Sequence, residues 1–234
     1  NQKINLLTNS KFIESKRNIG RIKNRLLLAE KSQYQRLLFI DVDINPINEN
    51  FLKNYINQKN NGAIFFGGCV FRESENINCS LRNKFGKNRE EINSSQRNKN
   101  PFKYISSNNF MCEKDLLVEI LSEIDSFSYG NDYIFGAILK KKNVVVTHFD
   151  NPVLIEHIDE NSVFIQKTHQ ALYNIKNYHK KGKLKKHSIS ILKAYRFLDS
   201  FFMKKLFVEL SNIFMSKLEK NLHKENPNLF LFDL

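Results

Sequence analysis

The chain has 234 residues, of which 41% are hydrophobic and 12% aromatic, enough apolar side chain for the core of one medium-sized domain. Three cysteines without a Cys-x-x-Cys pair argue against a disulfide framework and a zinc knuckle, and favour a reducing, cytoplasmic compartment. No stretch approaches the roughly 20 consecutive apolar residues of a membrane span, and the first residues lack the apolar core of a signal peptide. Because the sequence begins with Asn1, we expect the natural amino terminus to lie upstream.

The apolar pattern predicts alternating helices and strands, which favours an α/β sheet. In chain order the expected elements are a helix at 22–31, a strand at 37–40, a helix at 49–58, strands at 63–66 and 69–71, helices at 114–123 and 131–142, and a strand at 144–147. Gly67 and Gly68, between two of the strands, predict a bulge or a close approach of backbone. Residues 72–103 are polar with little periodicity, which predicts a long loop or a lid.

The strand expected at 37–40 runs directly into Asp41 and Asp43. Because side chains alternate along a strand, the two carboxylates would point to the same side. Such a pair can share a hard divalent cation with a phosphorylated substrate. The alternative is a strand end followed by an ordinary turn, since Asn45, Pro46 and Asn48 are turn formers.

The positive charge is concentrated near the end of the chain. Residues 163–224 contain 14 Lys and Arg against three acidic residues, so +11 of the net charge of +13 lies there. Apolar residues from Ile191 to Ile213 recur at spacings of three and four, which predicts an amphipathic helix. A basic helix that contains Phe201, Phe202 and Phe207 is suited to an anionic membrane surface. The alternative is a helix that packs its apolar face on the domain and leaves its lysines in water.

Several short motifs follow one another between residues 18 and 168. They are Asn18-Ile19-Gly20-Arg21 with Arg25, the Asp41-x-Asp43 strand end, Gly67-Gly68, Leu81-Arg82, Phe85-Gly86-Lys87, Arg89-Glu90, Arg97-Asn98-Lys99-Asn100-Pro101, Ser107-Asn108-Asn109-Phe110, Tyr129-Gly130-Asn131-Asp132, Asn151-Pro152-Val153 and Phe164-Ile165-Gln166-Lys167-Thr168. In this order they resemble a family-two inverting glycosyltransferase of the GT-A fold, nearest to a bacterial subgroup common in surface-polysaccharide gene clusters.

The resemblance implies a GT-A (Rossmann-like) mixed sheet flanked by helices. The catalytic domain would occupy residues 1–165, without the family's first strand and helix, and residues 166–234 would form a basic helical extension. The implied reaction transfers a sugar, with inversion, from a nucleotide-diphosphate sugar to a hydroxyl of a saccharide or lipid-linked acceptor. The enzyme would be cytoplasmic, with peripheral attachment to the inner face of the plasma membrane as an option.

The resemblance also implies roles for individual residues. Asp132 would be the catalytic base, although a first-turn helix acid is its simpler interpretation. Asp43, assisted by Asp41, would hold Mn²⁺ or Mg²⁺ at the leaving diphosphate. Ile155 stands where the family often has a histidine ligand, so His157 is the substitute candidate. The remaining candidates are Arg21, Arg25, Gly67 and Gly68 for the donor, and Arg82, Arg89, Arg97, Asn108 and Asn109 for the diphosphate or the acceptor.

Two other function classes remain open. The missing first strand and helix allow an inactive nucleotide-sugar-binding fragment or scaffold. The basic end allows nucleic-acid binding, but no reader motif accompanies it and charge alone is poorly specific, so we expect no nucleic-acid partner.

Overall fold

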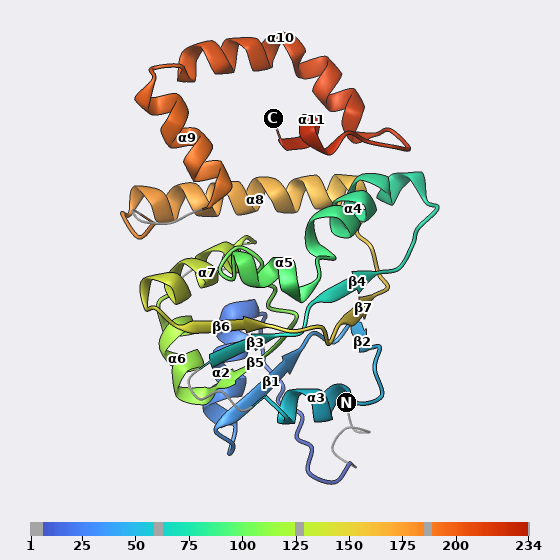
Figure 1. The fold of residues 1–234 in the computed structure, drawn as a ribbon, viewed down its shortest axis with the longest axis vertical. Coiled ribbons are helices and arrows are strands. Elements are labelled where there is room, and N and C mark those ends of the chain that lie inside the picture. Colours follow the sequence, from blue (N-terminus) through green and yellow to red (C-terminus); the bar gives the residue numbers. More distant parts are fainter. Residues whose placement is uncertain (1–6, 59–62, 125–128, 185–188, 234) are drawn as a thin grey trace.

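Two β-sheets with helices around them form the body of the protein (Figure 1). The computed structural model describes residues 7–58, 63–124, 129–184 and 189–233. Its strands are β1 (Arg36–Ile40), β2 (Ile44–Pro46), β3 (Ala63–Phe66), β4 (Cys69–Phe71), β5 (Asn109–Glu113), β6 (Val145–His148) and β7 (Val153–Ile155). Its helices are α2 (Arg21–Lys31), α3 (Phe51–Ile56), η1 (Ile77–Cys79), α4 (Ser80–Phe85), η2 (Gly86–Glu90), α5 (Ser94–Lys99), α6 (Lys114–Ser122), α7 (Asn131–Lys141), α8 (Asn161–Lys180), α9 (Ser190–Ser200), α10 (Lys204–Leu222) and α11 (Leu229–Asp233).

The larger sheet has the strand order β1-β5-β3-β6. Strand β5 is antiparallel to both of its neighbours, whereas β3 and β6 are parallel. Phe39 and Phe66 each stack on Phe110 of β5, and residues from α2, α6 and α7 complete the same core. The sheet is therefore mixed and flanked by helices, which confirms the expected α/β class.

The smaller sheet has the order β2-β7-β4 and is reached through the two glycines. Gly68 has a φ of 84°, a conformation that glycine adopts at little cost. A Cβ on Gly67 would lie 2.5 Å from the Asn109 Nδ2 atom, so a side chain does not fit there. The predicted close approach of backbone is confirmed, and it marks the passage of the chain from one sheet to the other.

In the middle of the chain one expectation was wrong, and one strand was missed. Residues 72–103 are not a long loop, because they contain η1, α4, η2 and α5. These short helices bury few apolar side chains, among them Leu81, so their sequence shows little periodicity. Strand β5 was not predicted at all, although its first four residues are buried at the centre of the larger sheet.

The end of the chain forms an arch above the body (Figure 1). Helix α8 begins at Asn161 and therefore runs through the expected domain boundary at residue 165. The amphipathic pattern that predicted one helix corresponds to two, α9 and α10, which are separated at Phe201 to Met203, where Phe202 has a φ of 55°. Among the described residues, no helix combines the length and the apolar character needed to cross a bilayer.

Candidate functional site

Arg25 is the centre of a buried polar cluster at the end of β1. Arg25 lies in α2 and is 5% exposed. The Nη2 atom donates to Asp41 Oδ1 at 2.7 Å and to the Ser107 carbonyl, and Nη1 donates to Ser107 Oγ at 2.8 Å. Burial lowers the pKa of Arg25, and the negative charge of Asp41 acts in the opposite direction. Because an arginine stays protonated in proteins, Arg25 itself carries a permanent positive charge, which is paired with the Asp41 carboxylate.

Asp132, on another element, acts on Arg25 through its charge. It lies in the first turn of α7, half-buried, and its charge interacts electrostatically with Arg25. Arg25 thus pairs directly with Asp41, whereas the interaction between Arg25 and Asp132 is electrostatic, and no hydrogen bond or ion pair between these two described residues joins them. The sequence-based prediction named all three residues but not their connection through Arg25.

Helix α8 fixes the loop in front of Asp132. The buried Asn174 amide donates to the Tyr129 carbonyl and to Asn131 Oδ1, both at 3.1 Å. Gly130 has a φ of 84°, and a Cβ there would lie 2.8 Å from the Ala171 Cβ atom. Asn174 was not predicted, and its only signal was a polar residue on the buried face of an amphipathic helix.

A cavity of about 340 Å³ opens at the N-terminus of α2, close to this cluster. It is lined by Ser15, Arg17, Asn18, Ile19, Gly20, Arg21 and Asn24. The Arg21 guanidinium lies 4.0 Å from the Asp41 carboxylate, so the cavity borders the strand end. Two arginines and the positive end of a helix dipole suit an anionic ligand.

The Asp-x-Asp segment is a turn rather than a continuation of the strand. Strand β1 ends at Ile40, so side-chain alternation does not apply to Asp41 and Asp43. Asp41 is paired with Arg25, whereas Asp43 is exposed and contacts no partner among the described residues. Because Ile44 pairs with Ile155, Asp43 and the exposed His157 lie at the same end of the β2-β7 ladder.

The fit of a metal ion can be judged from these positions. Within the described residues, no group of three or more His, Cys, Asp and Glu side chains is arranged to hold an ion. A dedicated all-protein site is therefore not present in that part of the chain. Asp43 still fits the way in which Mg²⁺ and Mn²⁺ are held beside phosphates, where one or two carboxylates suffice and the substrate and water supply the other ligands.

The two candidate asparagines differ in their surroundings. The Asn108 carbonyl accepts the Asp41 N–H at 3.1 Å, so Asn108 lies beside the cluster, and its side chain accepts from Ser106. Asn109 is fully buried: its Oδ1 accepts from the Tyr55 hydroxyl at 2.6 Å, and its Nδ2 donates to the Gly68 and Asn151 carbonyls. Asn109 therefore joins the two sheets and leaves no polar group for a ligand.

Arg82 and Arg89 each form an ion pair with an acidic residue of the same chain. Arg82 makes a two-point interaction with Glu90, at 3.2 and 3.0 Å, and lies over the rings of Phe71 and Phe164. Arg89 pairs with Asp233 of α11 at 2.7 Å, and both side chains are about half exposed. The structure places neither side chain in the Arg25 cluster.

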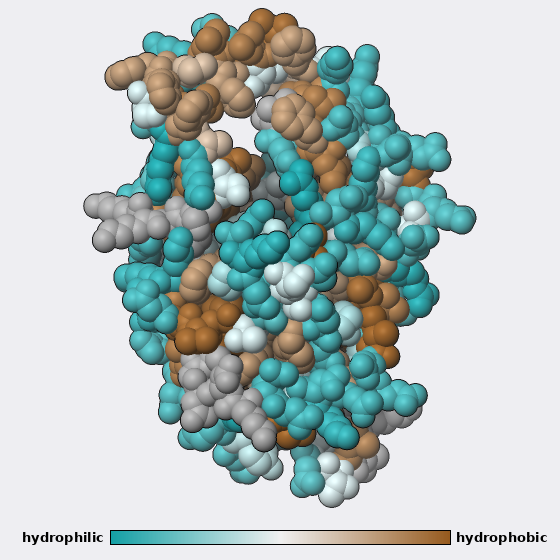
Figure 2. All heavy atoms as spheres, in the orientation of Figure 1, coloured by the Kyte–Doolittle hydropathy of each residue, from teal (hydrophilic) through white to brown (hydrophobic). Residues whose placement is uncertain are grey.

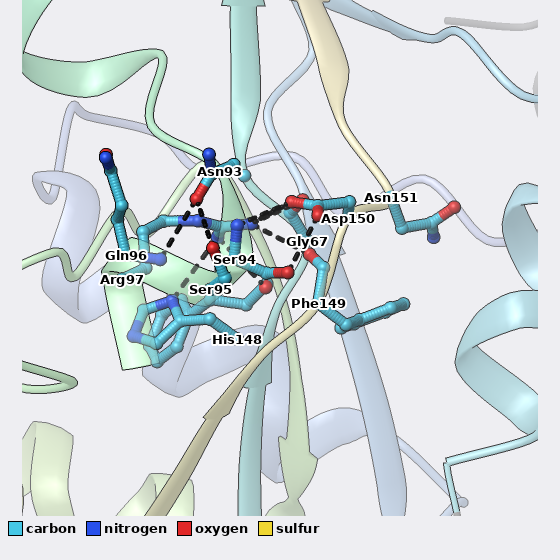
Figure 3. Close-up of polar contacts among 12 residues, drawn as sticks. Gly67, Asn93, Ser94, Ser95, Gln96, Arg97, His148, Phe149, Asp150 and Asn151 are labelled. Carbon is cyan, nitrogen blue, oxygen red and sulfur yellow. Dashed lines mark hydrogen bonds and ion pairs between the residues drawn. The ribbon is translucent and has the colours of Figure 1, made fainter. Parts of the chain in front are cut away.

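Arg97 is buried where the two sheets meet (Figure 3). It donates to the Phe66 carbonyl at 3.2 Å, to the Phe149 carbonyl at 2.8 Å and to Asp150 at 3.1 Å. A Cβ on Gly68 would lie 2.8 Å from its Nη2 atom. Gly67, Gly68 and Arg97, which the resemblance assigned to ligands, therefore lie in the packed junction between the sheets.

His148 completes this junction and gives it a dependence on pH. Its Nδ1 atom faces Arg97 Nη1 at 3.3 Å (Figure 3). Its Nε2 atom faces the Pro101 carbonyl at 2.9 Å. Because arginine only donates and a carbonyl only accepts, the fitting tautomer is neutral with the proton on Nε2. Burial, opposed by the Pro101 hydrogen bond and assisted by the Arg97 charge, lowers the pKa of His148 to about 4.

We expect stability to fall as the pH drops from about 6.5 to about 4. In this window the unfolded chain binds a proton at residue 148 and the folded protein does not, which costs the folded state about 3 kcal/mol in total. Urea unfolding at several pH values would measure how the free energy of unfolding changes with pH, and His148→Gln should make this dependence weaker. His157→Gln, at an exposed histidine, is the control and should leave the dependence as in the wild type. An unchanged pH dependence in His148→Gln would assign it to other groups.

A scan of protein-family models found none that matches this chain, and a search of curated proteins found no match either.

Proposed function

We propose that this protein is a metal-dependent inverting glycosyltransferase that uses a nucleotide-diphosphate sugar, in surface-polysaccharide biosynthesis. The observation that carries the proposal is the position of Arg25, which binds Asp41 and interacts with Asp132 next to the α2 cavity. The residues come from motifs that resemble the family, and they are separated by up to about a hundred positions in the sequence. A mixed sheet flanked by helices is compatible with the GT-A fold.

The donor would bind at the N-terminus of α2. Arg17 and Arg21 in the cavity offer charge for a diphosphate, and Asn18 and Asn24 offer polar contacts for the rest of the nucleotide. The Arg25 guanidinium cannot leave its buried place without breaking its bonds to Asp41 and Ser107. It would therefore act as a fixed positive charge that keeps the wall of the site in position.

Mn²⁺ or Mg²⁺ would be held by Asp43, with Asp41 or His157 near it, and would supply charge neutralisation at the leaving diphosphate. The pairing of Asp41 with Arg25 leaves Asp43 as the main candidate for this contact.

Asp132 would accept the proton of the acceptor hydroxyl while that oxygen attacks C1 of the sugar from the face opposite the leaving group. The C1–oxygen bond to the diphosphate breaks as the new C1–oxygen bond forms, so the configuration at C1 inverts. Asn174 would position Asp132 through the Tyr129-Gly130-Asn131 loop.

The experiment is titration calorimetry of uridine and guanosine diphosphate with and without Mn²⁺. We expect Mn²⁺ to strengthen binding of one of them, and Asp43→Asn to weaken this binding by about tenfold or more, because the ion loses a charged ligand. Glu49→Gln, a nearby exposed acid, is the matched control and should bind as wild type. Equal binding with and without Mn²⁺ in the wild-type protein would contradict the metal site.

A further inference from the structure

The two helices of the arch, α9 and α10 (residues 190–222), expose an unusual amount of apolar surface. Phe202, at the corner between them, is 93% exposed, and Ile213 in α10 is 73% exposed. The other large apolar residues that the arch exposes are Ile191, Tyr195, Phe197, Phe201, Met203, Leu206, Phe207, Val208, Leu210, Phe214 and Met215. Figure 2 shows hydrophobic atoms gathered on the arch and an opening between the arch and the body.

This surface is not used in packing the domain. Asn221 is the one residue of α10 that is buried, and the described part of α9 buries only Leu192. Exposed apolar residues of α10 such as Phe207, Leu210 and Phe214 follow helical spacing, whereas Lys205, Glu209 and Asn212 lie on the opposite side of the helix. An exposed apolar face of this extent marks an interaction site.

The charge of the same region identifies the partner. The arch has six Lys and Arg against three acidic residues, and it follows directly on the lysine-rich end of α8. Two copies of a chain with a net charge of +13 repel one another, so a second copy is a poor partner. An anionic bilayer attracts the lysines and accepts the phenylalanines at its headgroup boundary.

We propose that the arch binds the surface of an anionic membrane in the plane of the bilayer, with Phe202 and Ile213 inserted at the headgroup boundary. The proposal depends only on the surface of α9 and α10, and it holds whether or not the protein transfers a sugar. The sequence predicted a basic amphipathic extension over residues 166–234; the membrane-binding part of it would be α9, α10 and the corner between them.

The test is sedimentation of the full chain with vesicles of phosphatidylcholine alone or mixed with phosphatidylglycerol. We expect sedimentation with the anionic vesicles, weakened by high salt. The double variant Phe202→Ser and Ile213→Ser should lower vesicle partition by about tenfold or more, because two apolar side chains no longer enter the membrane.

The control is the double variant Tyr34→Ser and Ile56→Ser. It removes similar side chains, 74% and 70% exposed, from the body, and should sediment like the wild type. Equal sedimentation of the arch variant and the wild type would overturn the proposal. Analytical ultracentrifugation would detect the alternative partner, a second copy of the chain. If the wild type self-associates, the arch variant does not, and neither binds vesicles, the surface belongs to an interface between two copies. Nucleotide calorimetry on the same variants separates this result from the proposed activity.

Discussion

Asp132→Asn is expected to lower the turnover of sugar transfer by about 10²-fold or more, with donor affinity close to that of wild type. The amide that replaces the carboxylate cannot take the proton of the acceptor hydroxyl. The substitution is small, and among the described residues no hydrogen bond or ion pair of the Asp132 side chain holds α7, while Gly130 and Asn174 fix the loop before it. Steady-state kinetics and donor calorimetry would measure the two effects separately.

Asp115 provides a matched control for Asp132. Both residues are acids in the first turn of a helix, α6 and α7, where a negative charge interacts favourably with the helix dipole. Asp115→Asn and Asp132→Asn should therefore lose similar, small amounts of stability, about 0.3–1 kcal/mol. Only Asp132→Asn should lose turnover. Normal turnover in that variant would show that Asp132 is a first-turn acid and nothing more.

Local sequence signals were sufficient for much of the larger sheet and its helices. The strands β1, β3 and β6 and the helices α2, α6 and α7 each have a continuous apolar run or a clear helical period, and their predicted positions are confirmed within a few residues. Strand β5 has no such signal at its start, because Asn109 is buried for its hydrogen bonds to Tyr55, Gly68 and Asn151. The position of β5 depends on contacts between residues that are distant in the sequence, and a local sequence pattern does not reveal such contacts.

The site shows the same division. Residue type and order named Arg25, Asp41 and Asp132 as candidates, but they did not predict that the buried Arg25 binds Asp41 or that the charge of Asp132 acts on Arg25. The arginines of the polar stretch illustrate the limit of composition. Arg82 and Arg97 have the chemistry to hold a diphosphate, yet the structure pairs Arg82 with Glu90 and buries Arg97 between the sheets. Exposure and partners separate a ligand-binding arginine from a packing one, and a single sequence gives neither.

Arg97→Met is expected to reduce the free energy of unfolding by about 3 kcal/mol. The substitution keeps most of the apolar stem, but it leaves the Phe149 carbonyl and the His148 Nδ1 atom without their donor and removes the pair with Asp150. Each buried acceptor without a partner costs about 1–3 kcal/mol, and Asp150, more than half exposed, regains water and adds little. Urea unfolding followed by circular dichroism would measure the loss.

Arg89→Met separates this structural role from ligand binding. Arg89 comes from the same polar stretch and was assigned the same role by the resemblance, but its pair with Asp233 is solvent-exposed, so its loss should cost no more than about 1 kcal/mol. Nucleotide calorimetry on both variants completes the comparison. An Arg97→Met protein that unfolds like the wild type but binds the nucleoside diphosphate more weakly would place Arg97 in the donor site. A protein that loses stability and keeps its nucleotide affinity would place Arg97 in the junction between the sheets, because the α2 cavity would then bind the nucleotide without it.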